Sequence, residues 1–168
     1  EHKFGVRQKE KIRSLKSGIN VISLSATPIP RTLNLSLSKV RDISLITTPP
    51  TGRKSVKTIV SRYSKSLVFE AIQREFYRDG QVFYLLNNVS MLEEKKKEIS
   101  DRFPDKKIAF AHGQLRPKEL SVVMQSFIRK EIDLLVCTTI IESGIDIENA
   151  NTLIVEESQN YGLSQLHQ

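Results

Sequence analysis

From residue 56 onward, short apolar runs alternate with longer stretches in which apolar and charged residues are mixed. The short runs are rich in β-branched and aromatic residues, which is typical of buried strands. We expect strands at residues 56–61, 81–86, 107–111, 133–137 and 152–155. We expect helices at residues 65–78, 91–103 and 117–130, and a turn after Glu142. This alternation predicts an α/β fold, in which helices cover both faces of a parallel sheet.

Two residues mark the expected ends of helices. Gly80 follows the first helical stretch and is expected to stop it, because glycine is common just beyond a helix C-terminus. Pro117 opens the third stretch, where a first-turn proline is favourable.

The loops that follow the strands are the places to look for a binding site. In open parallel sheets, ligands bind beyond the carboxyl ends of the strands. Three pairs of polar or small residues follow expected strands: Asn87 and Asn88, His112 and Gly113, and Thr138 and Thr139.

The first third of the chain differs from the rest. A short basic helix is expected at 7–17, and short strands at 21–24 and 43–46. Residues 47–54 contain two prolines and a glycine among polar neighbours, which indicates a linker. We therefore expect a domain boundary there.

Positive charge is concentrated before this linker. Residues 1–50 contain nine Lys or Arg and three Asp or Glu, whereas residues 51–168 contain seventeen and sixteen. Such a basic cluster could contact phosphates, or it could be a solvated helix face or an interdomain surface. Charge alone favours the second interpretation.

Composition sets further limits on the class of protein. No apolar stretch approaches the ~20 residues that a membrane-spanning helix needs, and no secretory signal pattern is visible. The single cysteine, Cys137, lies in an apolar run and is expected to be a buried hydrophobe. The cytoplasm is the expected compartment. Glu1 and Gln168 are expected to be boundaries within a longer protein.

Three segments combine small, hydroxyl or charged residues at expected strand ends. Residues 25–32 could approach a phosphate, or could simply cap a turn. Residues 137–147 contain Gly144, which permits a tight turn, and Asp146 between two isoleucines. This aspartate could have a fixed functional role, or could cap a turn. Residues 110–114 contain His112, for which a role in a turn is the simpler interpretation. A metal site is not expected there, because no other histidine lies near it in the sequence.

These segments resemble the motifs of superfamily 2 helicases. Residues 25–27 (Ser-Ala-Thr) resemble motif III, and residues 138–147 resemble motif V. The opening Glu-His resembles the end of the Asp-Glu-x-His box, motif II, and Gln168 resembles the first residue of the arginine-rich motif VI.

A narrower resemblance is carried by residues 26–33 and 162–168. Both stretches are similar to RecG helicases and to the bacterial transcription-repair coupling factors, and residues 4–7 are shared by both groups. Within this pair, the coupling factors are favoured by residues 40–44, 48–50 and 150–154.

The resemblance implies two RecA-like motor domains. Residues 1–46 would be the C-terminal part of the first domain, 47–55 a linker, and 56–168 the second domain, ending at motif VI. In this family, ATP and Mg²⁺ bind between the two domains. The chain alone is expected to be inactive as an ATPase, because the P-loop, the motif II acids and the motif VI arginines are absent from it.

The resemblance also implies residue roles. Residues expected at the ATP cleft, or in coupling it to DNA, are His2, Ser25, Ala26, Thr27, Arg31, Thr32, Gly144, Asp146 and Gln168. Residues expected to contact the DNA backbone are Thr138, Thr139, His112, Gly113 and Asn88. Such contacts reach phosphate and sugar rather than bases, so binding is expected to be independent of sequence.

The function implied is that of a double-stranded DNA translocase that displaces stalled RNA polymerase and recruits excision repair through UvrA. One alternative is a RecG-like branch-migration helicase. An alternative from another class is a non-catalytic nucleic-acid-binding or scaffold domain with the same fold.

Overall fold

The computed structural model describes residues 55–139, 147–162 and 165–166, together with positions 22, 24, 44, 46 and 48. The chain divides into two units, and the second runs from Lys54 to Leu166, with Gln168. The helices and strands below all belong to this second unit.

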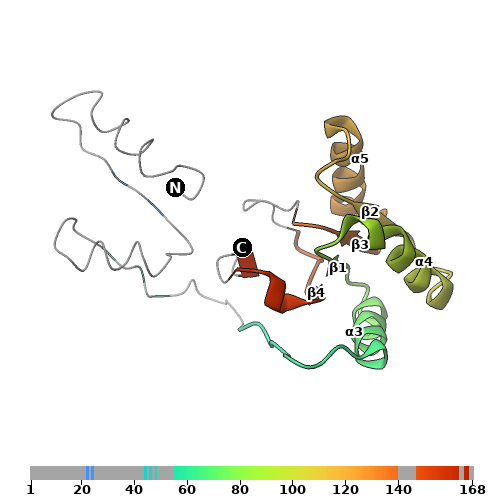
Figure 1. The fold of residues 1–168 in the computed structure, drawn as a ribbon, viewed down its shortest axis with the longest axis horizontal. Helices are drawn as coiled ribbons and strands as arrows, with labels where there is room; N and C mark the ends of the chain where they lie inside the picture. The colour runs from blue at the N-terminus through green and yellow to red at the C-terminus, as the bar shows by residue number, and fades with distance from the viewer. Residues whose placement is uncertain are drawn as a thin grey trace. The chain divides into compact units, whose positions relative to one another are not determined.

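Four parallel strands form the centre of this unit (Figure 1). They are β1 (Val82–Leu85), β2 (Ile108–Ala111), β3 (Leu134–Cys137) and β4 (Thr152–Val155). Their order in the sheet is β2-β3-β1-β4. All four lie within the strands expected from the sequence, because each is a short run rich in apolar and β-branched residues.

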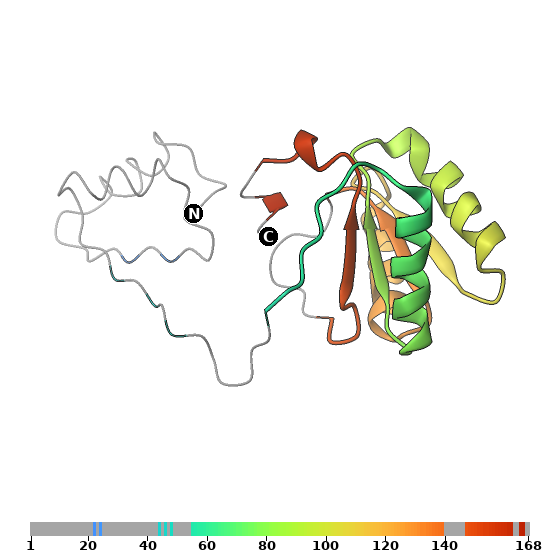
Figure 2. The ribbon, with the colours of Figure 1, turned by 90° about the horizontal axis from the view of Figure 1, so that it is seen from below.

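Helices cover both faces of the sheet, as expected (Figure 2). They are α3 (Lys65–Tyr77), α4 (Leu92–Arg102) and α5 (Pro117–Ile128). Short 3-10 helices lie at Val89–Met91 (η2) and Ser158–Asn160 (η3).

The sheet separates two apolar cores. Ile72 and Phe76 of α3, with Leu92 and Ile99 of α4, pack with Val136 on one face. On the other face, the alternate residues of β3 pack against α5, where the buried residues are Ala111, Phe127, Leu135 and Cys137. The expected burial of Cys137 is confirmed, and burial raises the pKa of its thiol to about 12.

The first helix ends differently from the expectation. The Asp79 N–H donates to the Phe76 carbonyl (3.1 Å), and the Gly80 N–H donates to the Glu75 carbonyl (3.0 Å). These two bonds form a Schellman motif. Its left-handed residue is Asp79, with φ 58°, rather than Gly80. Aspartate tolerates this region because its short polar side chain can bond locally.

The prediction of a strand at residues 56–61 is wrong. Residues 55–61 have no regular structure and are exposed. Val56 and Val60 are β-branched, but β-propensity depends on packing against a neighbouring strand. Within the described residues, no strand pairs with this segment.

Most of the expectations for the first third fall outside the described residues. They are the basic helix at 7–17 and most of the two strands at 21–24 and 43–46. The described positions of those strands, Ile22, Leu24, Ser44 and Ile46, are exposed and without strand structure. The turn expected after Glu142 also lies outside the described residues.

Lys130, just after α5, has a left-handed backbone conformation that is unfavourable for lysine. It has φ 59° and donates its N–H to the Phe127 carbonyl (3.1 Å), while Glu131 donates to Ser126 (2.9 Å). A lysine in this left-handed position lacks the local bonding that favours aspartate. We expect Lys130→Gly to raise the free energy of unfolding by about 0.5–1 kcal/mol, measured by urea denaturation.

Lys130→Ala is the control for the lost side chain. It removes the weak contact with exposed Asp79 (3.7 Å) but keeps a Cβ in the left-handed region. If alanine stabilises as much as glycine, backbone strain is not the cause.

Candidate nucleic-acid interface

The strands that carry the expected site residues end together at one edge of the sheet. Leu85 of β1 and Ala111 of β2 are both in register with Cys137 of β3. The residues that follow these three strands therefore emerge at the same edge. This carboxyl edge brings together Asn88, His112–Gly113 and Thr138–Thr139.

The two threonines differ in what they offer. The Thr138 N–H donates to the Ala111 carbonyl (3.3 Å), and its side chain is half-buried. Its amide is therefore already used by the sheet, which leaves the hydroxyl. Thr139 is exposed. Hydroxyls can donate to phosphate oxygens, so both side chains could contact the phosphate backbone of a nucleic acid.

His112 has features of both a turn residue and a binding residue. Its carbonyl accepts from the Leu115 N–H (3.1 Å), which closes the turn after β2. Its ring stacks on Phe110, with centroids 6.1 Å apart and planes 7° apart. The ring Nδ1 is buried without a hydrogen-bond partner in the described structure. Gly113 beside it is exposed.

Asn88 caps the 3-10 helix η2. Its side-chain oxygen accepts from the Ser90 N–H (3.0 Å) and from the Ser90 hydroxyl (2.8 Å). This cap orients the exposed side chain and leaves the amide nitrogen as a donor. A phosphate oxygen needs a donor, so the nitrogen is the group that could contact it.

Two cations at the start of α5 were missed by sequence reasoning. Arg116 and Lys118 are exposed and follow the turn that leaves β2 at the carboxyl edge. Positive charge is the main requirement for binding a phosphate backbone. The helix N-terminus adds partial positive charge at the same place. Their position directly after the His112 turn was the available signal.

A network of charged and tyrosine side chains around the buried Lys95 also lies at this edge and was not predicted. It is called here the Lys95 network, and its members are Tyr63, Tyr84, Lys95, Glu98 and Glu156. The Lys95 ammonium lies 2.9 Å from a Glu98 oxygen, 3.4 Å from a Glu156 oxygen and 3.2 Å from the Tyr63 hydroxyl. The Tyr84 hydroxyl donates to Glu156 (2.6 Å).

The network keeps its charges despite burial. Burial alone would lower the pKa of Lys95, but hydrogen bonds to Glu98 and Tyr63 and the charge of Glu156 raise it overall. Burial alone would raise the pKa of Glu98, but Lys65 and Lys95 lower it overall. Burial, together with the bond to Glu156, raises the pKa of Tyr84. Near neutral pH, Lys95 and Glu98 therefore form a charged pair.

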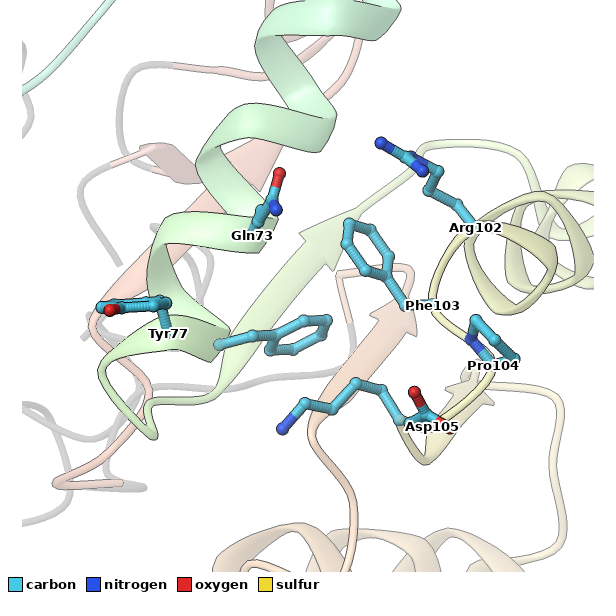
Figure 3. Close-up of a pocket in the computed structure, with 8 residues that line it drawn as sticks. Gln73, Tyr77, Arg102, Phe103, Pro104 and Asp105 are labelled. Atoms are coloured by element: carbon cyan, nitrogen blue, oxygen red, sulfur yellow. The ribbon is translucent and has the colours of Figure 1, made fainter.

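A hollow of about 310 Å³ lies away from these residues. Figure 3 shows Gln73 and Tyr77 on one side of it and Arg102, Phe103, Pro104 and Asp105 on the other. These residues come from the ends of α3 and α4, which lead into the amino ends of β1 and β2. The hollow is thus at the opposite end of the strands from the candidate interface.

The residues assigned to the ATP cleft lie outside the described residues. They are His2, Ser25, Ala26, Thr27, Arg31, Thr32, Gly144, Asp146 and Gln168. Across the described ranges, no three His, Cys, Asp or Glu side chains gather closely enough to hold a metal ion. The helices of the described ranges are also too short or too polar to cross a membrane.

Comparison with known proteins identifies the family. Residues 65–168 match the helicase conserved C-terminal domain. The transcription-repair-coupling factor of Escherichia coli (strain K12) is 49% identical over all 168 residues, which amount to 15% of that protein. The factor of Staphylococcus aureus (strain USA300) is 52% identical over the same residues, 14% of its length.

A solved structure supports the same assignment. The structure of RecG bound to a three-way DNA junction has a TM-score of 0.69 and 35% sequence identity, and the match covers 85% of this chain and 20% of that one. The expected RecA-like fold, a parallel sheet covered by helices, is therefore confirmed. The chain belongs to the helicase conserved C-terminal domain family.

Proposed function

We propose that this chain is part of an ATP-dependent double-stranded DNA translocase that displaces stalled RNA polymerase and couples transcription to nucleotide excision repair. The observation that carries the proposal is the identity of 49–52% with transcription-repair-coupling factors along the whole chain. In the full-length protein, the partners would be duplex DNA, RNA polymerase and UvrA, and the compartment would be the cytoplasm.

The domain assignment follows from this proposal. Residues 56–168 would be the second motor domain, residues 47–55 a linker, and residues 1–46 the end of the first motor domain. ATP and Mg²⁺ would bind where the two motor domains meet and would supply the free energy for movement. The described residues would contribute the grip on DNA.

The proposed grip consists of donors spread along the carboxyl edge. The hydroxyls of Thr138 and Thr139, the amide nitrogen of Asn88, the turn at His112 and Gly113, and the ammonium of Lys118 would contact phosphate and sugar oxygens. An asparagine can read adenine with both of its amide atoms, but the oxygen of Asn88 already accepts two bonds from Ser90, which leaves only its nitrogen. Binding would accordingly be independent of DNA sequence.

A RecG-like branch-migration helicase is the second candidate, favoured by the match to RecG. The two candidates share the motor and differ in the domains attached to it. A polymerase-interaction domain in the full-length protein would support the first, and a wedge-like DNA domain the second. A non-catalytic scaffold is the remaining alternative, and it predicts no DNA-dependent ATP hydrolysis in the full-length protein.

The grip can be tested through its salt dependence. We expect the chain to bind a labelled duplex weakly, with affinity that falls steeply with salt, because it engages only a few phosphates. Lys118→Ala should reduce the slope of log K against log salt by about 0.9, which is the change for one lost phosphate contact. Fluorescence anisotropy at several salt concentrations measures this slope.

Lys107→Ala is the matched control. Lys107 is also an exposed lysine, but it precedes β2 and so lies at the opposite end of the strands. Its removal should lower the slope by much less. Equal effects of the two substitutions, or tight binding to one DNA sequence, would count against the proposed interface.

A further inference from the structure

The segment that enters the second unit is extended and has few attachments. Residues 55–62 are exposed and have no regular structure. Among the described hydrogen bonds of residues 55–63, the one that reaches another element is made by the side chain of Tyr63, whereas Ser61 bonds only to its neighbour Arg62. Following the chain from residue 55, Tyr63 is therefore the first residue that fixes this segment to the rest of the unit.

Tyr63 is attached at two points of its side chain. Its hydroxyl accepts from the Lys95 ammonium (3.2 Å), and its ring lies with its centroid 5.2 Å from the same nitrogen. Lys95 is only 8% exposed and is held by Glu98 and Glu156 as well. A buried cation with several acceptors is costly to displace, so Lys95 is a firm point of attachment.

The same ammonium also holds the segment that leaves the sheet. Glu156 directly follows β4, and its N–H donates to the Leu85 carbonyl (3.0 Å). The next residue, Glu157, turns the chain in the left-handed region, with φ 52°. Lys95 therefore joins the incoming chain, through Tyr63, to the outgoing chain, through Glu156.

We propose that Tyr63 is a positioning residue of the motor: it fastens the incoming connection to the carboxyl edge of the sheet, so that displacement of that connection moves the DNA-gripping edge with it. This inference rests on the proposed translocase function. Tyr63 would act through Lys95, which its side chain contacts.

The length of chain released by loss of the Tyr63 attachment sets how far the connection could move before it pulls on the sheet. Without this attachment, the next fixed points are Ser64, which caps α3, and Lys65, which pairs with Glu98 (2.6 Å). One or two released residues add roughly 3–7 Å of reach. Successive base pairs along DNA are about 3.4 Å apart. The slack would thus match a movement of one or two base pairs.

The attachment itself can be measured in this chain. A spin label on Val60→Cys reports the mobility of the segment, because Val60 is 87% exposed and Cys137 is buried and poorly reactive. We expect Tyr63→Phe, which removes the hydroxyl, to increase the mobility of the label. Tyr63→Ala, which also removes the ring, should increase it further.

Tyr77→Phe is the matched control, because Tyr77 ends α3 and is 95% exposed. It should leave the mobility of the label unchanged. Unchanged mobility in Tyr63→Ala would overturn the proposal at this first step, whatever the function of the protein.

The consequence for the motor is measured in the full-length protein, as base pairs moved per ATP hydrolysed on duplex DNA. Tyr63→Ala should lower this ratio by about twofold or more, because slack of one base pair absorbs half of a two-base-pair movement and all of a one-base-pair movement, while DNA-stimulated ATP hydrolysis and DNA affinity stay near the wild-type values. An unchanged ratio would overturn the inference and leave the translocase intact. If the wild-type protein shows no DNA-stimulated ATP hydrolysis, the proposed function itself fails.

Discussion

Phe127→Ala is expected to lower the free energy of unfolding by about 3–5 kcal/mol, the range for removing a fully buried aromatic ring. Phe127 is 0% exposed on α5, and its ring lies 4.7 Å from that of Phe83 in β1. The core on this face of the sheet is small, so few neighbours can move in to fill the space. Urea denaturation followed by far-UV circular dichroism measures the loss.

Val122→Ala is the control on the same helix. Val122 is exposed, so its removal leaves no cavity, and alanine favours the helix. It should change stability by less than about 0.5 kcal/mol. A loss below about 1 kcal/mol for Phe127→Ala would mean that α5 does not pack on the sheet through this ring.

Gly80→Ala is expected to cost about 2–3 kcal/mol, although its backbone conformation is open to alanine. An ideal Cβ at Gly80 would overlap a carboxylate oxygen of Glu75. This carboxylate is fully buried, pairs with Arg78 and accepts from the Thr152 hydroxyl. The alanine would therefore push out a buried charge that two partners hold in place. Urea denaturation again provides the measurement.

A double-mutant cycle shows whether Glu75 is the cause. With Glu75→Ala already present, the added methyl has room, and Gly80→Ala should be neutral or slightly stabilising. Gly162→Ala is a second control, because the atom of the described residues that its Cβ would meet is a Gln165 oxygen, at an ordinary contact distance of 3.5 Å. An equal cost of Gly80→Ala with and without Glu75 would contradict this explanation.

The sheet and its helices could be predicted because their signals are local. β3 is a continuous apolar run, and the burial of all four of its residues follows from its central position between β1 and β2. The segment at 56–61 shows the limit of the same reasoning. Its composition is that of a strand, but pairing depends on a neighbour that the composition does not specify.

The Lys95 network could not be predicted for a related reason. Lys95 lies in a run of three lysines, which reads as a solvated helix face. Its burial depends on Tyr63, which is 32 residues away, and on Glu156, which is more distant still. Only the fold brings these residues together. The Thr, His and Asn residues at the strand ends were easier to find, because a parallel sheet places all of its strand ends at one edge.

The order of strands in the sheet also affects how the chain folds as it is synthesised. β3 pairs with both β1 and β2, whereas β1 and β2 do not pair with each other. β1 begins at Val82 and β3 at Leu134. At typical rates of synthesis, roughly 3–10 s separate their appearance. During that time the apolar faces of β1, β2, α3 and α4 have no sheet to join, so the nascent chain is most exposed to aggregation, and to chaperone binding, just before β3 emerges.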